Sequence, residues 1–250
     1  MLRIHCTNCG FEREPLISPF GFKGGYLSEL WQIAVLLESS SGRTGLGLAT
    51  QSVLWSDADV FVRHSETDGN RLMFDMTAHA LRTAEDVGFE RPIELLEQIL
   101  PAVYDHGKRI TGNDRLRLTF ALNALVALDF AAWQLYASEH DRAGFDALLE
   151  SDEAKALPER HRQLMAIPLV PYGMFAAAIA KLIEEGFSLL KIKIGADPAQ
   201  DGDPEKMLEW DKARLSEIHA LAEEVRTPHT RDGHIAYYLD ANGRYDTKAR

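Results

Sequence analysis

The stretch Phe187-Ser188-Leu189-Leu190-Lys191-Ile192-Lys193-Ile194-Gly195 decides the fold of the second part of this chain. It is a short apolar run with β-branched residues between two glycines, which is typical of a buried strand. Lys191 and Lys193 stand two positions apart, so they lie on the same face of the strand. Two ammonium groups on one face of a buried strand repel each other and are costly to desolvate. The pair therefore indicates a strand that opens into a charged site, or else an edge strand with both lysines in solvent.

A second apolar strand, residues 235–243, ends in a carboxylate, and its Asp240 and Asn242 share one face. The intervening residues 204–226 carry apolar side chains close to helical spacing. Strand, helix and strand in this order predict a parallel pair with a right-handed crossover. Lys193 and Asp240 would then lie at the same C-terminal edge of the sheet, where α/β folds place their chemistry.

Length and composition are consistent with one large domain or two smaller ones. Hydrophobic residues make up 46% of the 250 residues, enough for a sizeable core. The net charge of −11 and the lack of a basic stripe argue against nucleic-acid binding. No apolar run approaches the length of a membrane span and no signal peptide is recognisable, so we expect a cytoplasmic protein that does not bind membranes.

The two cysteines, Cys6 and Cys9, have the spacing of half a zinc site or of a redox pair. The sequence has no second pair of ligands at matching spacing, and the motif does not precede a helix in a βαβ unit. Two reduced thiols in an N-terminal loop or strand are therefore the favoured interpretation over metal binding or redox use.

The first part of the chain combines a hairpin with helices. The hairpin strands are predicted at 29–38 and 44–49, around a turn at 39–42. Apolar periodicity predicts three helices, at 70–86, 92–105 and 116–137, with Pro101 kinking or restarting the second. Asp129 is the odd residue in the third helix, and we favour a structural role for it, paired to a cation or capping a backbone group. Residues 138–165 are predicted to form a helical connector.

The glycine-rich segment 19–26 contains Phe20 and Phe22, which look exposed. Such a composition suits a mobile loop with apolar tips. It is either a plain connector or a lid that covers a ligand and excludes water.

From residue 166 onward the pattern predicts three β units and two α units. The strands are expected at 167–173, 187–194 and 235–240, and the helices at 174–185 and 205–226. Gly186 is suited to cap the first of these helices.

Four stretches together resemble the enolase superfamily, on the side of mandelate racemase and muconate lactonizing enzyme. Residues 34–48 resemble the hairpin of the family's capping domain, and residues 124–135 resemble the helix that joins cap to barrel. Lys191-Ile192-Lys193 looks like the Lys-x-Lys motif of the second barrel strand. Asp240-Ala241-Asn242-Gly243 looks like the third-strand motif that carries the first metal ligand.

The resemblance implies an α/β fold: an α+β capping domain at 1–165, then the first three strands of a modified TIM-type (β/α) barrel at 166–250. It implies a Mg²⁺-dependent enzyme that removes the α-proton of a small-molecule carboxylate through an enediolate, as a racemase, epimerase or cycloisomerase. Lys193 would be the base, Asp240 would bind Mg²⁺, and Lys191 would lower the pKa of Lys193 or contact the substrate carboxylate. A metal and nearby ammonium groups would stabilise the dianionic enediolate.

The resemblance also implies substrate contacts from both parts of the chain. In the first part they would come from the cap loop, through Phe20, Phe22 and Lys23. In the second part they would come from strand ends, through Tyr172 and Asn242.

The sequence departs from the family pattern in several places, including a longer N-terminal region and a longer loop at 196–204 with the helix after it. Ala49 ends the hairpin where family members often carry an acidic residue, and the chain stops at Arg250, just after the third strand. A whole barrel takes about 250 residues by itself. Three parallel strands alone leave an apolar face and open edges, so we expect the C-terminal half of the barrel on a longer polypeptide or a separate chain. Family members are commonly homo-oligomers, and the same is expected here.

Three other interpretations stay open. The nearest is an acid-sugar dehydratase of the same superfamily. Another is a non-catalytic fragment or binding subunit that lacks the full metal site. The last is a structural ion pair among Lys191, Lys193 and Asp240, which would leave one charge unpaired.

Overall fold

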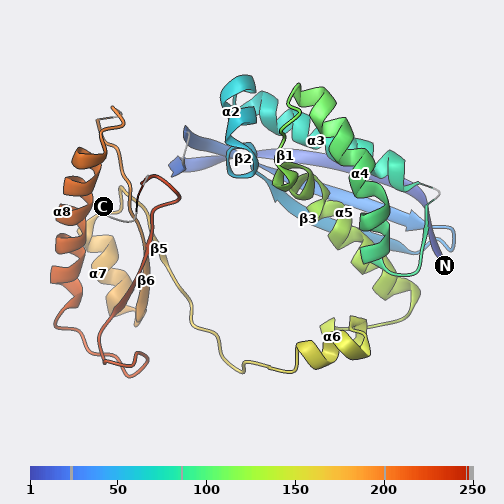
Figure 1. Cartoon of the computed structure of the whole chain (residues 1–250). Coiled ribbons are helices and arrows are strands. Elements are labelled where there is room, and N and C mark those ends of the chain that lie inside the picture. Colours follow the sequence, from blue (N-terminus) through green and yellow to red (C-terminus); the bar gives the residue numbers. More distant parts are fainter. Residues whose placement is uncertain (23–24, 86, 200, 246, 248–250) are drawn as a thin grey trace. The chain divides into compact units, whose positions relative to one another are not determined.

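The computed structural model describes residues 1–22, 25–85, 87–199, 201–245 and 247, without the side chains at 18 and 20–22. It shows a mixed α/β protein that divides into two compact units, Met1–Pro158 and Glu159–Arg250 (Figure 1). The sequence pattern had predicted a division after residue 165. The difference lies in the connector, because residues 157–167 are exposed and have no regular secondary structure.

The first unit is built on a four-stranded antiparallel sheet with the order β3-β2-β1-β4. Its strands are β1 (Leu2–Phe22), β2 (Gly25–Ser39), β3 (Thr44–Gln51) and β4 (Gly88–Phe89). The predicted hairpin is confirmed as β2 and β3, with Trp31 paired to Gln51 at one end and Glu38 paired to Thr44 at the other. Val35 and Leu37 point into the core while Leu36 faces outward, as the period of a strand requires.

The prediction of a mobile loop at 19–26 is wrong for its described residues. Phe20 pairs with Leu27 and Phe22 pairs with Gly25, so both segments belong to the β1–β2 hairpin. Pro15 borders a register shift that ends at Phe20, and Pro19 lies within it, which is the kind of irregular position where strands tolerate proline. Lys23 lies outside the described residues.

Helices cover one face of this sheet (Figure 1). They are α1 (Val53–Ser56), α2 (Ala58–His64), α3 (Glu66–Ala84), α4 (Pro92–Thr111) and α5 (Leu118–Glu139). Helix α3 begins earlier than predicted because the Ser65 hydroxyl caps it by accepting the Asp68 N–H. Helix α4 continues through Pro101 to the left-handed Gly112, so the predicted restart is wrong. Pro101 has no N–H to donate to the carbonyl one turn earlier in the helix. Because Pro101 is exposed, that carbonyl can bond to water instead.

Helix α5 lies against β3 with almost no space between the two backbones. A Cβ at Gly47 would stand 2.5 Å from the Ala131 nitrogen, and one at Gly45 would stand 2.5 Å from the Leu135 nitrogen. Glycine at both positions therefore permits the close approach of helix and strand. The buried face of α5 contributes Phe120, Leu128 and other residues to the main hydrophobic core.

Helix α5 is also long and apolar enough to cross a membrane by length and composition, contrary to the expectation from the sequence. Half of its most apolar window is buried, and it packs in the core of the first unit. The helix is therefore accounted for as the central helix of this unit. Its Asp129 is half-buried and accepts a hydrogen bond from Trp133, so the expected cation or backbone partner is replaced by an indole N–H. Burial raises the pKa of Asp129.

The connector is less helical than predicted. It contains only a 3₁₀ turn at Phe145–Leu148 and the short helix α6 (Ser151–Ala156). Arg91 ties α6 to the start of α4 through Glu153 at 2.9 Å. The remaining residues lack the apolar periodicity that would give a helix a face to bury.

The second unit is a three-stranded parallel sheet with the order β5-β6-β7. Its elements are β5 (Leu169–Val170), α7 (Ala176–Glu184), β6 (Leu189–Lys193), α8 (Pro204–Ala222) and β7 (Ala236–Asp240). Each was predicted, although β5 is much shorter than 167–173. Leu190 and Ile192 of β6 share a small core with Ile179 of α7 and Ile218 of α8. The alternate residues of β6, the two lysines, therefore face away from both helices.

Cys6 and Cys9 are free thiols on β1, paired with Glu38 and Val35 of β2. Three residues along a strand span roughly 10 Å, which is too far for a disulfide. Burial raises the pKa of the Cys9 thiol. These observations agree with two reduced thiols in a strand.

Candidate active site at the ends of β6 and β7

Lys193 and Asp240 are direct partners in the register of two adjacent parallel strands. Both are the last residues of their strands, so they lie at the C-terminal edge of the sheet. Lys191 pairs with Tyr238 two positions earlier, which places all four residues on one face. The geometry expected from the sequence is present.

Asp240 and Asn242 both offer oxygen acceptors to the Lys193 ammonium. Its Nζ lies 2.8 Å from Asp240 Oδ2 and 2.7 Å from Asn242 Oδ1. The side chain is only 5% exposed, although it carries a charge. A buried ammonium needs such acceptors, because water no longer solvates it.

Lys191 shares the same carboxylate, with its Nζ 3.0 Å from Asp240 Oδ2. It also lies 5.3 Å from the centre of the Tyr238 ring, in a cation–π arrangement. Burial acts to raise the pKa of Asp240, but hydrogen bonds from Lys193 and Lys191 outweigh it and lower the pKa to about 2. The hydrogen bond to Asp240 raises the pKa of Lys191.

The pKa of Lys193 is lowered, mainly by burial, while the hydrogen bond to Asp240 opposes the shift. Repulsion by Lys191 also lowers it, but as the smallest of these causes. The pKa of Lys193 is therefore lowered, as expected from the sequence, but burial and not repulsion by Lys191 is the main cause. The interior position of the amine matters more than its charged neighbour.

Of the other predicted site residues, Asn242 contacts Lys193 and Tyr172 bonds to the backbone next to it. Asn242 adopts a left-handed backbone with φ of 48° and turns its side chain to Lys193. The Tyr172 hydroxyl donates to the carbonyl of Ile194, and its ring meets Trp210 edge-on. The side chains of Phe20 and Phe22, and all of Lys23, lie outside the described part of the structure.

Three residues near the site were not predicted: Asp211, Arg244 and Tyr245. Asp211 of α8 accepts hydrogen bonds from Gly195 N–H, at 2.6 Å, and from the Tyr245 hydroxyl. Its position offered a signal, because it lies in the buried stripe of α8 with Met207 and Ile218. A carboxylate at core spacing in a helix calls for a specific partner.

The oxygen atoms at this edge of the sheet supply only part of the ligands that a hard cation such as Mg²⁺ needs. Asp240 and Asn242 supply carboxylate and amide oxygens, the ligand types that Mg²⁺ prefers. Within the described ranges, no group of three or more His, Cys, Asp or Glu side chains is arranged to hold a metal ion. The described residues therefore fit one or two positions of an octahedral site, and the other ligands would have to come from elsewhere.

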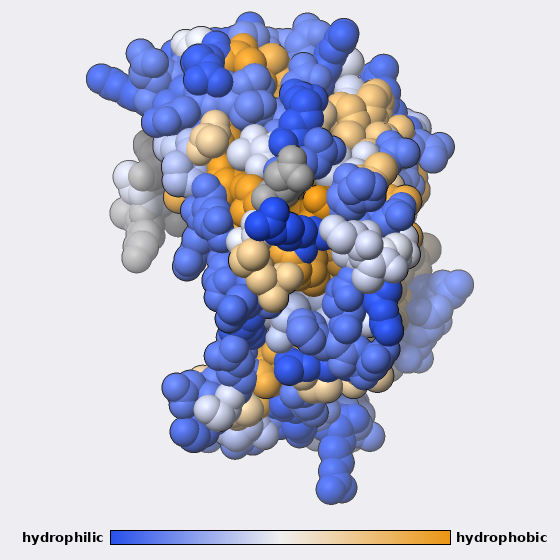
Figure 2. Space-filling view, turned by 90° about the vertical axis from the view of Figure 1, so that its right-hand side faces the viewer, coloured by the Kyte–Doolittle hydropathy of each residue, from blue (hydrophilic) through white to orange (hydrophobic). Residues whose placement is uncertain are grey.

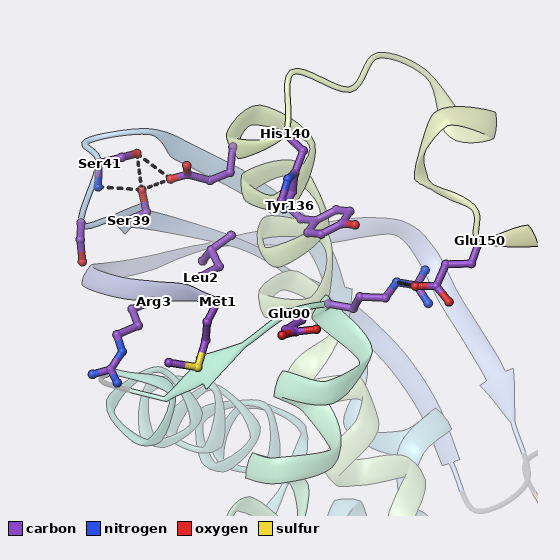
Figure 3. A pocket seen from close by; sticks show the side chains of 12 residues that line it. Met1, Leu2, Arg3, Ser39, Ser41, Glu90, Tyr136, His140 and Glu150 are labelled. Carbon is purple, nitrogen blue, oxygen red and sulfur yellow. Dashed lines mark hydrogen bonds and ion pairs between the residues drawn. The ribbon is translucent and has the colours of Figure 1, made fainter.

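A hollow of about 610 Å³ in the first unit is a separate candidate (Figure 3). Its wall includes Glu139, which accepts hydrogen bonds from Ser39 and Ser41, and Arg91, which lies 3.3 Å from Glu150. Glu139 is thus bonded by serine hydroxyls and Arg91 is paired with an acid, and the described lining includes none of the predicted site residues. Figure 2 shows one face of the molecule, on which hydrophilic side chains predominate and hydrophobic ones form small patches between them.

Comparison with solved structures identifies the fold. A dipeptide epimerase from Enterococcus faecalis, complexed with Mg and a dipeptide, matches 97% of this chain with a TM-score of 0.56 and 17% identity. An enolase from Bradyrhizobium, complexed with magnesium and mandelic acid, matches 98% with a TM-score of 0.58 and 16% identity. An L-talarate dehydratase from Polaromonas, complexed with Mg and L-glucarate, matches 98% with a TM-score of 0.56 and 18% identity.

These enzymes are members of the enolase superfamily, and the resemblance seen in the sequence is confirmed at the level of the fold. The chain spans 55% of the length of the first two matched structures and 56% of the third. No protein-family model matches the sequence. No curated protein matches it significantly in sequence.

Proposed function

We propose that this chain is part of an enolase-superfamily enzyme that removes a proton from the carbon next to a carboxylate. The observation that carries the proposal is the apposition of Lys193 and Asp240 on paired strand ends. In this assignment Met1–Pro158 is the capping domain and Glu159–Arg250 begins the barrel. The magnesium-bound epimerase and dehydratase among the structural matches support the same general chemistry.

In the proposed mechanism Lys193 is the base. An amine can accept a proton near neutral pH only if its surroundings lower its pKa, and burial acts on Lys193 in that direction. Asn242 holds the amine by its side-chain oxygen, and Lys191 places a second positive charge beside the developing enediolate. Asp240 would bind Mg²⁺, which would neutralise charge on the substrate carboxylate. Phe20, Phe22, Lys23, Tyr172 and Asn242 remain proposed substrate contacts.

The test is exchange of a substrate α-proton with solvent deuterium in the presence of Mg²⁺. A library of acylated amino acids, dipeptides and sugar acids covers the substrate classes of the proposal. We expect exchange that Lys193→Ala abolishes and that Lys181→Ala, at an exposed lysine of α7, leaves unchanged. Absence of exchange across the library, with the rest of the barrel present, would contradict the assignment.

A dehydratase of acid sugars is the second candidate, because an L-talarate dehydratase is among the structural matches. Its first step would use the same base, followed by loss of a hydroxyl group from the adjacent carbon. Formation of a keto acid from a sugar acid, rather than simple exchange of its α-proton, distinguishes this reaction. A binding subunit without catalysis would show neither result.

We also propose that further strands extend the sheet beyond β7, from the same polypeptide or another chain. Tyr238 and Leu239 point to opposite faces of β7, and both are about half exposed. An apolar parallel strand is normally covered on both faces. Native mass spectrometry of the protein purified from its source should show a longer chain or a second fragment. We also propose that the assembly is a homo-oligomer and that it lies in the cytoplasm. A folded, lone monomer of 28.0 kDa would contradict this.

A further inference from the structure

The loops that follow β6 and β7 begin immediately after the two central site residues. Ile194 N–H donates to the carbonyl of Asp240 at 3.1 Å, and the chain then turns at Gly195 with φ of 86°. A Cβ at Gly195 would lie 2.6 Å from Arg244 Cβ, so the two loops are in close contact. Any movement of these loops would therefore act directly on Lys193 and Asp240.

Asp211 of α8 joins the two loops through one carboxylate oxygen. Its Oδ2 accepts the Gly195 N–H of the first loop at 2.6 Å and the Tyr245 hydroxyl of the second. Arg244 adds a parallel link, because its Nε donates to the Gly195 carbonyl at 3.1 Å. Both the N–H and the C=O of Gly195 are thus held by side chains from other segments.

Burying the Asp211 carboxylate costs desolvation free energy, and this cost indicates that the carboxylate has a specific role. Asp211 is only 3% exposed, and burial raises its pKa although hydrogen bonds from Tyr245 and Gly195 oppose the shift. An apolar residue at this position would satisfy the packing of α8 without desolvating a carboxylate. An acid that reaches both loops does what an apolar residue cannot, because it fixes their backbones relative to each other.

We propose that Asp211 is a positioning residue, which clamps the loops after β6 and β7 and thereby fixes the separation of Lys193 and Asp240. That this separation matters for catalysis rests on the proposed function. That Asp211 fixes the separation does not. Tyr245→Phe is the first test, because it removes one hydroxyl of the clamp. Tyr237→Phe is its matched control, since Tyr237 of β7 also bonds to α8, through His219 at 3.1 Å.

The readout is the NMR signal of the Lys193 side chain, in the full chain labelled with ¹³C at lysine Cε and assigned with Lys193→Arg. We expect Tyr245→Phe to shift or broaden the Lys193 signal while that of Lys181 stays in place. Tyr237→Phe should leave the Lys193 signal unchanged, although it lowers the thermal midpoint by a similar amount. Asp211→Asn should shift the Lys193 signal in the same direction as Tyr245→Phe.

An unchanged Lys193 signal in Tyr245→Phe and in Asp211→Asn, with the same loss of thermal stability as in the control, would overturn the proposal. That pattern would mean that Asp211 only stabilises the unit. Because the measurement uses neither substrate nor metal, its outcome is independent of the deuterium-exchange assay. Failure of the clamp and failure of the proposed function are therefore distinguishable.

Discussion

At the scale of single residues, the two ammonium groups of the site share one carboxylate. One oxygen of Asp240 lies within 3.0 Å of both ammonium groups, and the nearly buried Lys193 has a further acceptor in Asn242. Replacing one member of such a group leaves a desolvated charge behind, whereas replacing both members removes the problem. This asymmetry gives a direct test of the geometry.

We predict that Asp240→Asn lowers the free energy of unfolding by about 2–3 kcal/mol, because it removes a carboxylate that lies 2.8 Å from a buried ammonium. The double variant Lys193→Met/Asp240→Asn should be more stable than the single variant, since the buried charge is gone. Urea unfolding of the four members of this cycle measures the coupling. A double variant as unstable as the sum of the two single variants would show that the pair does not interact.

The sequence predicted the residues of this site but not all of their contacts. Lys191, Lys193 and Asp240 follow from strand period and parallel order, which are local properties. The contact of Asn242 with Lys193 depends on a left-handed turn at 242, and the role of Asp211 depends on the path of two loops. Neither can be derived from spacing, because both require the three-dimensional arrangement of distant segments.

At the scale of elements, long periodic segments were predicted well and their ends less well. Helix α5 and strand β6 have strong apolar patterns, and the structure confirms both. Strand β1 was missed because its prolines and glycines suggest a loop, whereas pairing with β2 over most of its length keeps it extended. Tertiary hydrogen bonds here outweigh local propensity.

The contact of α5 with β3 predicts a sharp difference between two glycines of the same sheet. Gly47→Ala should lower the free energy of unfolding by about 2–4 kcal/mol, because its Cβ would meet the backbone of α5. Gly10→Ala should change it by no more than about 0.5 kcal/mol, because nothing lies within 4 Å of a Cβ there. Urea unfolding measures both variants, and equal effects would rule out the close approach of helix and strand.

Helices α3 and α4 meet through two stacked imidazoles and should respond to pH. The rings of His79 and His106 are 3.9 Å apart at 15°. Burial lowers the pKa of each, and Arg82 and Arg109 lower both further, while Asp75 opposes the shift at His106. The unfolded chain therefore binds protons more readily, so this contribution to stability is complete above about pH 6.5 and is lost as the pH falls.

We predict that His106→Phe, which preserves a stacked ring without a titrating group, loses less stability between pH 7 and pH 5 than the unchanged protein. His161→Phe is the control, because His161 lies in the exposed connector. Urea midpoints at the two pH values give the comparison. The same pH dependence in both variants would mean that the stacked pair contributes nothing to it.

At the scale of the whole molecule, the two units are joined by an exposed segment. Residues 157–167 are exposed and lack regular secondary structure, and they include Arg160 and Arg162. Exposed segments of this kind are where proteases cut first. The division into units is thus a physical property of the chain that can be measured.

Limited trypsin digestion should cut first after Arg160 or Arg162, and mass spectrometry should find two fragments that resist further cleavage. The variant Arg160→Gln/Arg162→Gln should survive longer under the same conditions. First cleavage within α5 or α8 instead would show that the helices open before the connector is reached.

We propose that Asp240 and Lys193 together form a metal-assisted site for proton abstraction at the ends of β6 and β7. Anomalous X-ray scattering tests the metal half of this proposal, in crystals that contain the rest of the barrel and are soaked in Mn²⁺ in place of Mg²⁺. We predict an anomalous peak at coordination distance from the Asp240 carboxylate, with the Lys193 amine on the same face, and no peak in Asp240→Asn. Manganese bound elsewhere, with Asp240 still engaged only by the two lysines, would contradict the account.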